Sequence, residues 1–245
     1  MKLNCDLGES YGAWDMPVDK EIMPLLDQAN IACGFHAGDP STIKSAISLA
    51  IQFDVEIGAH PSYPDLQGFG RRSMAMSKTE LIDCLHYQLS AIDGLCRQAG
   101  TRMHYVKPHG ALYNDMMKSP QVRLTVMEAV SSYAGGQTLM IQAHPDQRQH
   151  EKEAKNFALS LYFEAFADRR YQDDGLLVSR RESGAVLEHD EALSQVEHLL
   201  NNGVIVTQSG QTLAMSVDTL CVHGDTKGAV TMAKAIRQRL QSKND

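Results

Sequence analysis

Short apolar runs alternate along the chain with longer amphipathic stretches, and this alternation limits the available folds more than any other feature. Helical patterns lie between most of the runs, which is typical of βα units around a parallel sheet. The 204–215 segment would add an eighth strand if it joined that sheet. The sequence itself predicts seven strands, near residues 3–7, 29–35, 55–59, 103–106, 139–143, 159–165 and 219–222.

The predicted strands have an apolar face and a face that turns polar at the carboxyl end. Leu3 and Leu7 share one face of the first strand, and Asn4 and Asp6 share the other, because successive side chains point to opposite faces. An open sheet with helices on both faces would bury these polar groups. A closed barrel instead has an open rim at the carboxyl ends of its strands, where such groups can be used. The pattern therefore predicts a single α/β barrel domain over 1–245, with the active site at the carboxyl ends of its strands.

Several helix starts carry recognisable capping signals. Asp39 and Ser119 each precede a proline, and Ser77 stands three residues before Glu80 as in a capping box. A further helix is predicted at 191–200, but the rest of the 175–211 region has no clear pattern.

Composition excludes several classes of partner. The formal net charge is −7 with acids and bases mixed along the chain, so no basic stripe favours nucleic acid. No apolar run approaches the roughly 18 residues that a membrane span needs, and the polar start MKLNCDLGES is unlike a signal peptide. The five cysteines form no CxxC pair, which favours reduced thiols. We therefore expect a cytoplasmic protein without nucleic-acid or membrane partners.

Six segments combine ionisable groups with glycine or proline, and most of each lies where a strand meets a helix. They are NCDLGES (4–10), ANIACGFHAGDP (29–40), IGAHPSYPDLQGFGRR (57–72), VKPHGALYN (106–114), EAFADRRY (164–171) and CVHGDT (221–226). Strand ends of a barrel converge on one rim, so these segments supply the candidate site. The predicted catalytic residues are Asp6, His36, His60, Lys107, His109 and Glu164. The predicted substrate-binding residues are Asn4, Asn30, Arg72, Asn114, Arg169, His223 and Asp225.

The residue types suggest their chemistry. Histidines gathered at several strand ends suit proton transfer, although a lone histidine is usually structural, and His144 stays open between the two interpretations. Lys107 lies between Val106 and a proline, which favours stabilisation of negative charge or binding of a carboxylate. Arg72 and Arg169 are open between anion binding and salt bridges to Asp65, Asp168 or Asp173.

Cofactor signals are weak. Aspartate and histidine from separate strands suit zinc or another divalent ion, but the helices contain no HxxxH or HExxH pair. The sequence therefore assigns no metal ligands, and a divalent metal stays open. The chain also has no GxxxxGK[ST] phosphate loop, so no motif announces a nucleotide site.

The six segments closely resemble the pattern of the LamB/YcsF family in order and spacing, from residue 3 to about residue 230. Lys227 is a departure, because the pattern leads us to expect a proline there. The resemblance implies a distorted, seven-stranded TIM-like barrel of the glycoside hydrolase/deacetylase type. It also implies the role of the A subunit in an ATP-dependent 5-oxoprolinase, which cleaves 5-oxo-L-proline to L-glutamate with ATP as co-substrate and needs the 5-oxoprolinase subunits B and C.

A mechanism consistent with these residues uses Asp6 or Glu164 as a base and the histidines at 36, 60 and 109 as proton-transfer or hydrogen-bonding groups. Lys107 would hold an anionic oxygen. Two other functions remain alternatives: a metal-dependent hydrolase or deacetylase acting on a sugar, and a non-catalytic carbohydrate-binding or regulatory module. An aromatic content of 6% disfavours the second, since such modules use aromatic platforms.

Overall fold

The structure is a computed structural model that describes residues 1–133, 137–224 and 228–243. Seven parallel strands close into a barrel in the order β1-β2-β3-β4-β5-β6-β9, which confirms the predicted seven-stranded α/β barrel. The barrel strands are β1 (Lys2–Leu7), β2 (Gln28–Ala32), β3 (Glu56–His60), β4 (Tyr105–Val106), β5 (Thr138–Gln142), β6 (Leu161–Phe166) and β9 (Thr219–Val222).

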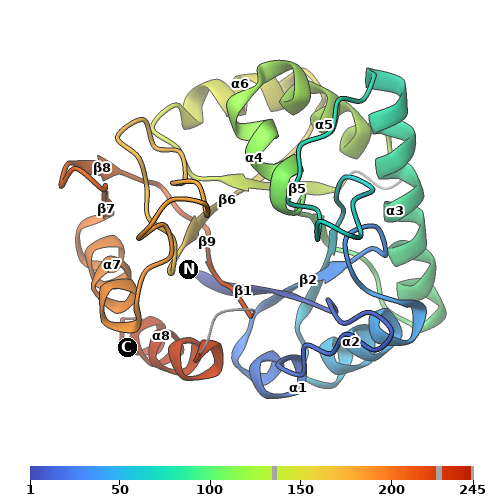
Figure 1. Cartoon of the computed structure of the whole chain (residues 1–245), viewed down its shortest axis with the longest axis horizontal. Helices are drawn as coiled ribbons and strands as arrows, with labels where there is room; N and C mark the ends of the chain where they lie inside the picture. Colours follow the sequence, from blue (N-terminus) through green and yellow to red (C-terminus); the bar gives the residue numbers. More distant parts are fainter. Residues whose placement is uncertain (134–136, 225–227, 244–245) are drawn as a thin grey trace.

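Helices form a ring outside the barrel (Figure 1). They are α1 (Asp19–Ile22), the 3₁₀ helix η1 (Met23–Leu25), α2 (Pro40–Gln52), α3 (Lys78–Gln98), α4 (Gly110–Lys118), α5 (Pro120–Ser132), α6 (Gln147–Lys155), α7 (His189–Asn202) and α8 (Ala229–Ser242). Within the described part of the chain, no helix is long and apolar enough to cross a membrane.

The 204–215 segment does not supply an eighth barrel strand. It forms a separate antiparallel pair, β7 (Val204–Val206) and β8 (Thr212–Ala214), which lies beside α7 outside the barrel (Figure 1). Gly210 adopts a φ of 88° in the connecting turn, a conformation that glycine adopts without a steric penalty. The tight turn pairs the two short strands with each other.

The predicted helix caps are present. The Asp39 carboxylate accepts hydrogen bonds from the backbone N–H groups of Ser41 and Thr42, and Ser77 forms a complete capping box with Glu80. The Ser119 hydroxyl accepts from the backbone N–H of the residue three positions later. Each cap contributes about 1 kcal/mol to helix stability and fixes where the chain leaves the preceding loop.

The strand faces divide as their alternation predicts. Leu3 and Leu7 are fully buried against the helices, while Asn4 points into the barrel. The Asn30 amide donates to the side-chain oxygens of both Asn4 and Asp6 at 2.8 Å. Inside the barrel, the Tyr105 hydroxyl donates to the Asn30 side chain at 2.7 Å. The lumen is therefore filled by a hydrogen-bonded polar layer below the rim.

Three strands are shorter than predicted, β6 by a single residue. β2 ends at Ala32, so His36 lies in the following loop and not at a strand end. Gly38 turns this loop back with a φ of 83°, and a Cβ there would lie 2.8 Å from the Gly8 carbonyl oxygen. The close approach of these two loops requires glycine at this position. β4 begins at Tyr105, two residues later than predicted, and ends at Val106 as predicted.

Candidate active site

A pocket of about 350 Å³ opens at the carboxyl ends of the barrel strands. Its lining includes eight of the residues predicted from sequence: Asp6, His60, Arg72, Lys107, His109, Asn114, Arg169 and His223. These residues come from segments that are far apart in the chain, and barrel closure brings them together. Asp225, predicted to bind substrate, lies outside the described residues, as does Lys227.

Lys107 lies at the floor of the pocket between two carboxylates. Its Nζ is 2.8 Å from Asp6 Oδ1 and 2.9 Å from Glu164 Oε1, and the residue is only 2% exposed. Burial disfavours the charged form, but the neighbouring carboxylates of Asp6 and Glu164 together raise the pKa of Lys107 well above its ordinary value. The ammonium charge is therefore present throughout the neutral range, inside a low-dielectric environment that strengthens its interactions.

Asp6 connects this lysine to the histidines. Its second oxygen, Oδ2, lies 3.3 Å from His60 Nε2. Burial alone would raise the pKa of Asp6, but His60 and Lys107 hold it well below its usual range. Asp6 is thus a carboxylate that faces the pocket.

Three predicted site residues lie deeper than the pocket wall. Glu164 is fully buried, and its Oε2 accepts a hydrogen bond of 2.9 Å from the Tyr113 hydroxyl. Asn4 and Asn30 are fully buried in the polar layer of the lumen. They orient Asp6 from below, and a direct contact with substrate stays a prediction for all three.

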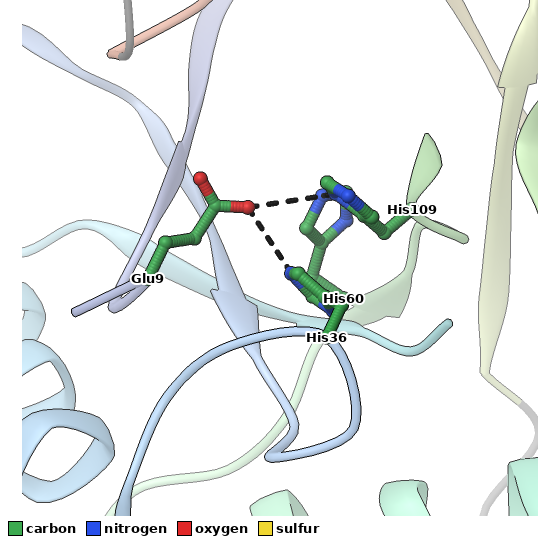
Figure 2. Close-up of side chains that lie close together, drawn as sticks. All are labelled: Glu9, His36, His60 and His109. Carbon is green, nitrogen blue, oxygen red and sulfur yellow. Dashed lines mark hydrogen bonds and ion pairs between the residues drawn. The ribbon is translucent and has the colours of Figure 1, made fainter. Parts of the chain in front are cut away.

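Glu9, His36, His60 and His109 form a cluster at one side of the site (Figure 2). His36 is fully buried behind the other three, which line the pocket. Glu9 Oε1 lies 3.1 Å from His36 Nε2 and 3.5 Å from His109 Nδ1. The His36 and His109 rings stack with centroids 3.8 Å apart, and the His60 ring meets both edge to face. Burial, with repulsion from the neighbouring imidazoles, lowers the pKa of His36 and His109 well below the ordinary value. These two rings are therefore neutral near pH 7.

A second set of ligand-type atoms belongs to Asp6, Cys221 and His223. However, the Lys107 ammonium lies 3.3 Å from Cys221 Sγ and 2.8 Å from Asp6 Oδ1. Burial also raises the pKa of Cys221 well above its ordinary value, so the sulfur stays a thiol. A metal ion here would be repelled by the lysine and would lack a thiolate ligand.

The arginines of the rim have different partners. Arg72 forms a salt bridge with Asp65, one of the two alternatives left open for it, through a side chain that is 60% exposed. Arg169 is buried and donates to the backbone carbonyls of Val178 and Ala185, and burial lowers its pKa to about 10. Arg169 thereby holds the 178–185 loop against the rim, and anion binding by either arginine stays a prediction.

His223 pairs with Asp168 at the pocket edge. Its Nδ1 lies 2.8 Å from Asp168 Oδ1, and Asp168 is fully buried. Burial would raise the pKa of Asp168, but His223 and the nearby Arg180 and Arg169 lower it to about 2. The carboxylate therefore fixes the orientation of the His223 ring, which faces the pocket.

This pair predicts a loss of stability in acid. The folded pKa of Asp168, about 2, lies below the ordinary value of 3.8, so its contribution is present above pH 3.8 and is lost as the pH falls toward 2. The shift corresponds to about 2 kcal/mol. In urea unfolding, Asp168→Asn should destabilise the protein at pH 5, and the difference from the native chain should shrink by about 1 kcal/mol at pH 3. A difference that is equal at both pH values would contradict this role.

Several residues of the site were not identified from sequence. Glu9, Tyr113, Arg180 and Arg181 all line the pocket. Glu9 stands in the turn after β1, where the alternation of the strand no longer applies. Arg180 and Arg181 come from the region without a clear pattern, although an arginine doublet after an apolar run is a visible signal. His144, left open by the sequence, accepts a hydrogen bond from the backbone of Asp146 outside the described lining of the pocket.

Comparison with known proteins agrees with the fold and with the family resemblance. The model of the LamB/YcsF family matches residues 1–245. The chain is 50% identical to a 5-oxoprolinase A subunit of Pseudomonas putida, the second of that name, over 97% of its length and 93% of that protein. It is also 50% identical to the 5-oxoprolinase A subunit of Vibrio campbellii, over 98% of the chain and 95% of the relative.

Solved structures give the same result. A lactam utilization protein from Thermus thermophilus superposes with a TM-score of 0.90 at 36% identity, over 100% of this chain and 97% of that one. A putative cellobiose-phosphate cleavage protein from Enterococcus faecalis has a TM-score of 0.59 at 9% identity, over 99% of this chain and 92% of that one, so it shares the fold alone. With its motifs, its barrel and these full-length matches in agreement, the chain belongs to the LamB/YcsF family.

Proposed function

We propose that this chain acts as the A subunit of an ATP-dependent 5-oxoprolinase. It would open the lactam ring of 5-oxo-L-proline to give L-glutamate, coupled to hydrolysis of ATP to ADP and phosphate, together with subunits B and C. The observation that carries the proposal is the 50% identity, over nearly the whole length, to relatives that bear this name.

The pocket has a suitable size and character. A volume of about 350 Å³ lies at the lower end of the range for small-molecule sites, roughly 300–1,000 Å³. Its wall holds the buried cation Lys107 and the carboxylate Asp6 close together. Opening a small cyclic amide that carries a carboxylate needs a cation beside the amide oxygen and a base for the attacking water, and Lys107 and Asp6 are groups of these two kinds.

The chemistry explains the need for ATP. A lactam is stabilised by resonance, so its carbonyl carbon is a poor electrophile. Transfer of the γ-phosphoryl group of ATP to the amide oxygen would break that resonance and expose the ring carbon to water. The attacking water then needs a base, the oxygen needs a cation, and the departing nitrogen needs a proton. Departure of the nitrogen leaves an acyl phosphate, and a second water hydrolyses it to the carboxylate of glutamate and free phosphate.

We assign the stabilisation of the oxygen to Lys107. Its ammonium is fixed by Asp6 and Glu164 and does not have to be reoriented as negative charge develops. A preformed cation in a buried site stabilises developing charge more than one in water does. Tyr113 would hold Glu164, and through it the lysine.

We assign the base to Asp6 rather than Glu164. Asp6 lines the pocket, whereas Glu164 is fully buried and already accepts from Tyr113. The low pKa of Asp6 depends partly on Lys107. Negative charge that develops on the substrate oxygen beside Lys107 raises the pKa of Asp6, so Asp6 becomes a better proton acceptor at the moment a proton must be accepted.

Binding of anionic groups falls to the rim. Arg71, Arg180 and Arg181 line the pocket and suit the substrate carboxylate or phosphate oxygens of ATP. The chain has no phosphate-loop motif, so nucleotide binding would use a different site here or a site in the partner subunits. Calorimetric titration of ATP into the isolated chain distinguishes these arrangements.

The decisive experiment measures glutamate release from 5-oxo-L-proline and ATP with and without the B and C subunits. We expect the assembled complex to release glutamate and phosphate in equal amounts, and omission of any one component to abolish this. Absence of glutamate from the complete, folded complex would contradict the proposal. ATP-independent release of acetate from an acetylated sugar would support the alternative deacetylase, which the named relatives do not favour.

A further inference from the structure

The Glu9–His60–His109 wall brings three ligand-type atoms to one point. Glu9 Oε1 lies 3.5 Å from His109 Nδ1, and His109 Nδ1 lies 3.0 Å from His60 Nε2. Figure 2 shows the Glu9 carboxylate turned toward the imidazoles. The three residues line the pocket and come from the turn after β1, from the end of β3 and from the start of α4.

Hydrogen bonds to backbone carbonyls fix the protonation of two of these rings. His60 Nδ1 lies 2.7 Å from the Lys107 carbonyl oxygen, so this nitrogen carries a hydrogen and donates it. His109 Nε2 lies 2.9 Å from the Phe69 carbonyl oxygen and donates in the same way. When each ring holds one hydrogen, the remaining nitrogens, His60 Nε2 and His109 Nδ1, are both acceptors, and a further proton or a metal ion is needed for His60 Nε2 to face the Asp6 carboxylate favourably.

These two acceptor nitrogens therefore face each other at 3.0 Å. Glu9 lies beside His109 Nδ1, and Asp6 Oδ2 lies 3.3 Å from His60 Nε2. Such lone pairs repel unless a positive species lies between them. A single proton can bridge two of these atoms, whereas one metal ion can bind the Glu9 oxygen and both imidazole nitrogens. Tetrahedral coordination with bonds of about 2.0–2.2 Å places ligand atoms roughly 3.3–3.6 Å apart. The 3.5 Å between Glu9 Oε1 and His109 Nδ1 fits this spacing, and the two imidazole nitrogens at 3.0 Å would separate by a few tenths of an ångström to admit the ion.

The surroundings are those of a metal site as well. Histidine ligands usually donate their second N–H to a carbonyl or carboxylate, which fixes the ring, and both rings do so here. Phe69 adopts a φ of 53°, a conformation that costs energy for a residue with a side chain, and its carbonyl accepts the His109 hydrogen in that conformation. His36 Nε2 lies 3.1 Å from Glu9 Oε1 and would hold the carboxylate in place.

We propose that Glu9, His60 and His109 bind a divalent transition-metal ion, through one carboxylate oxygen and two imidazole nitrogens. His36 is a positioning residue for Glu9. The mixed nitrogen and oxygen ligands favour ions such as Zn²⁺ or Co²⁺ over Mg²⁺ or Ca²⁺. Three protein ligands leave a coordination position toward the pocket. The inference concerns the chain alone and does not rest on the identity of the substrate.

Cobalt provides a direct probe, because its visible absorption reports the ligand geometry. The full chain is stripped with a chelator, and Co²⁺ is added while absorption and heat are recorded. We expect one equivalent to bind the native chain with the intense visible bands of a tetrahedral site. Glu9→Gln, His60→Gln and His109→Gln should each weaken binding at least ~10-fold, and His36→Gln about 10-fold.

Matched control variants make the same kinds of substitution at positions away from the site. His198→Gln and Glu151→Gln alter exposed positions on α7 and α6 and should bind Co²⁺ like the native chain. In the native chain alone, Zn²⁺ should raise the midpoint of thermal unfolding, a result that does not depend on the folding of any variant. The proposal is overturned if the native chain binds neither ion saturably, or if folded His60→Gln and His109→Gln bind as tightly as native. In that case a shared proton joins the two imidazoles.

Discussion

Replacing Lys107 with methionine is expected to lower glutamate release by the assembled complex by ~100-fold or more, because the substitution removes the buried cation beside the pocket. Methionine has nearly the same length, so the cavity keeps its shape. The main effect should be on kcat, since the ammonium interacts most strongly with charge that develops during the reaction. Steady-state kinetics of the complex, with folding checked by circular dichroism, measure this effect.

Chemistry and folding must be separated in this test, because the substitution leaves Asp6 and Glu164 without the cation between them. Loss of one partner of a buried pair costs roughly 3–5 kcal/mol of stability. The double variant Lys107→Met with Glu164→Gln also removes the charge of the Glu164 carboxylate, which the single variant leaves unpaired. It should recover part of the lost stability without recovering turnover. Lys44→Met changes an exposed lysine on α2 and serves as the control. A folded Lys107→Met enzyme with a native rate would refute the assignment of Lys107.

Asp6→Asn is expected to reduce turnover by ~10²–10⁴-fold, the range for loss of a general base. The amide is isosteric, but it cannot accept a proton from water at neutral pH. Lys107 keeps its ion pair with Glu164, so the variant should fold. The kcat of the complex is the measurement, and Asp146→Asn on the protein surface is the control.

The contrast between the two carboxylates makes this prediction specific. Glu164→Gln should lower the rate less than Asp6→Asn, because Glu164 acts through Lys107 and lies below the pocket. A Glu164→Gln variant that is the more damaged of the two would reverse the assignment and make Glu164 the base.

Much of the barrel could be predicted from the sequence, because a strand imposes its alternation locally. The polar parity of Asn4 and Asp6 and the apolar parity of Leu3 and Leu7 are properties of single strands, and both are confirmed. The same local logic applies to helix caps such as Asp39. The approximate position of the site at the strand ends followed from these features.

The side-chain directions in the turns after the strands could not be predicted from this alternation. Glu9 and His36 both lie beyond the last residue of their strands, so parity says nothing about their directions. His36 was predicted as a histidine at the end of a strand, but that strand ends at Ala32. Glu9 was not identified although its segment was. The rim arginines Arg180 and Arg181 come from a loop without periodicity, which Arg169 holds in place through backbone carbonyls.

The sequence by itself determined a parallel α/β barrel, the rim where its polar side chains gather, and membership in the LamB/YcsF family. Only the tertiary structure decided that Lys107 is held between two carboxylates and that the imidazoles of His60 and His109 present acceptor nitrogens to each other. The physical reason is distance. Strand alternation acts between neighbouring residues, whereas these contacts join positions 49 or more residues apart and form only when the sheet closes.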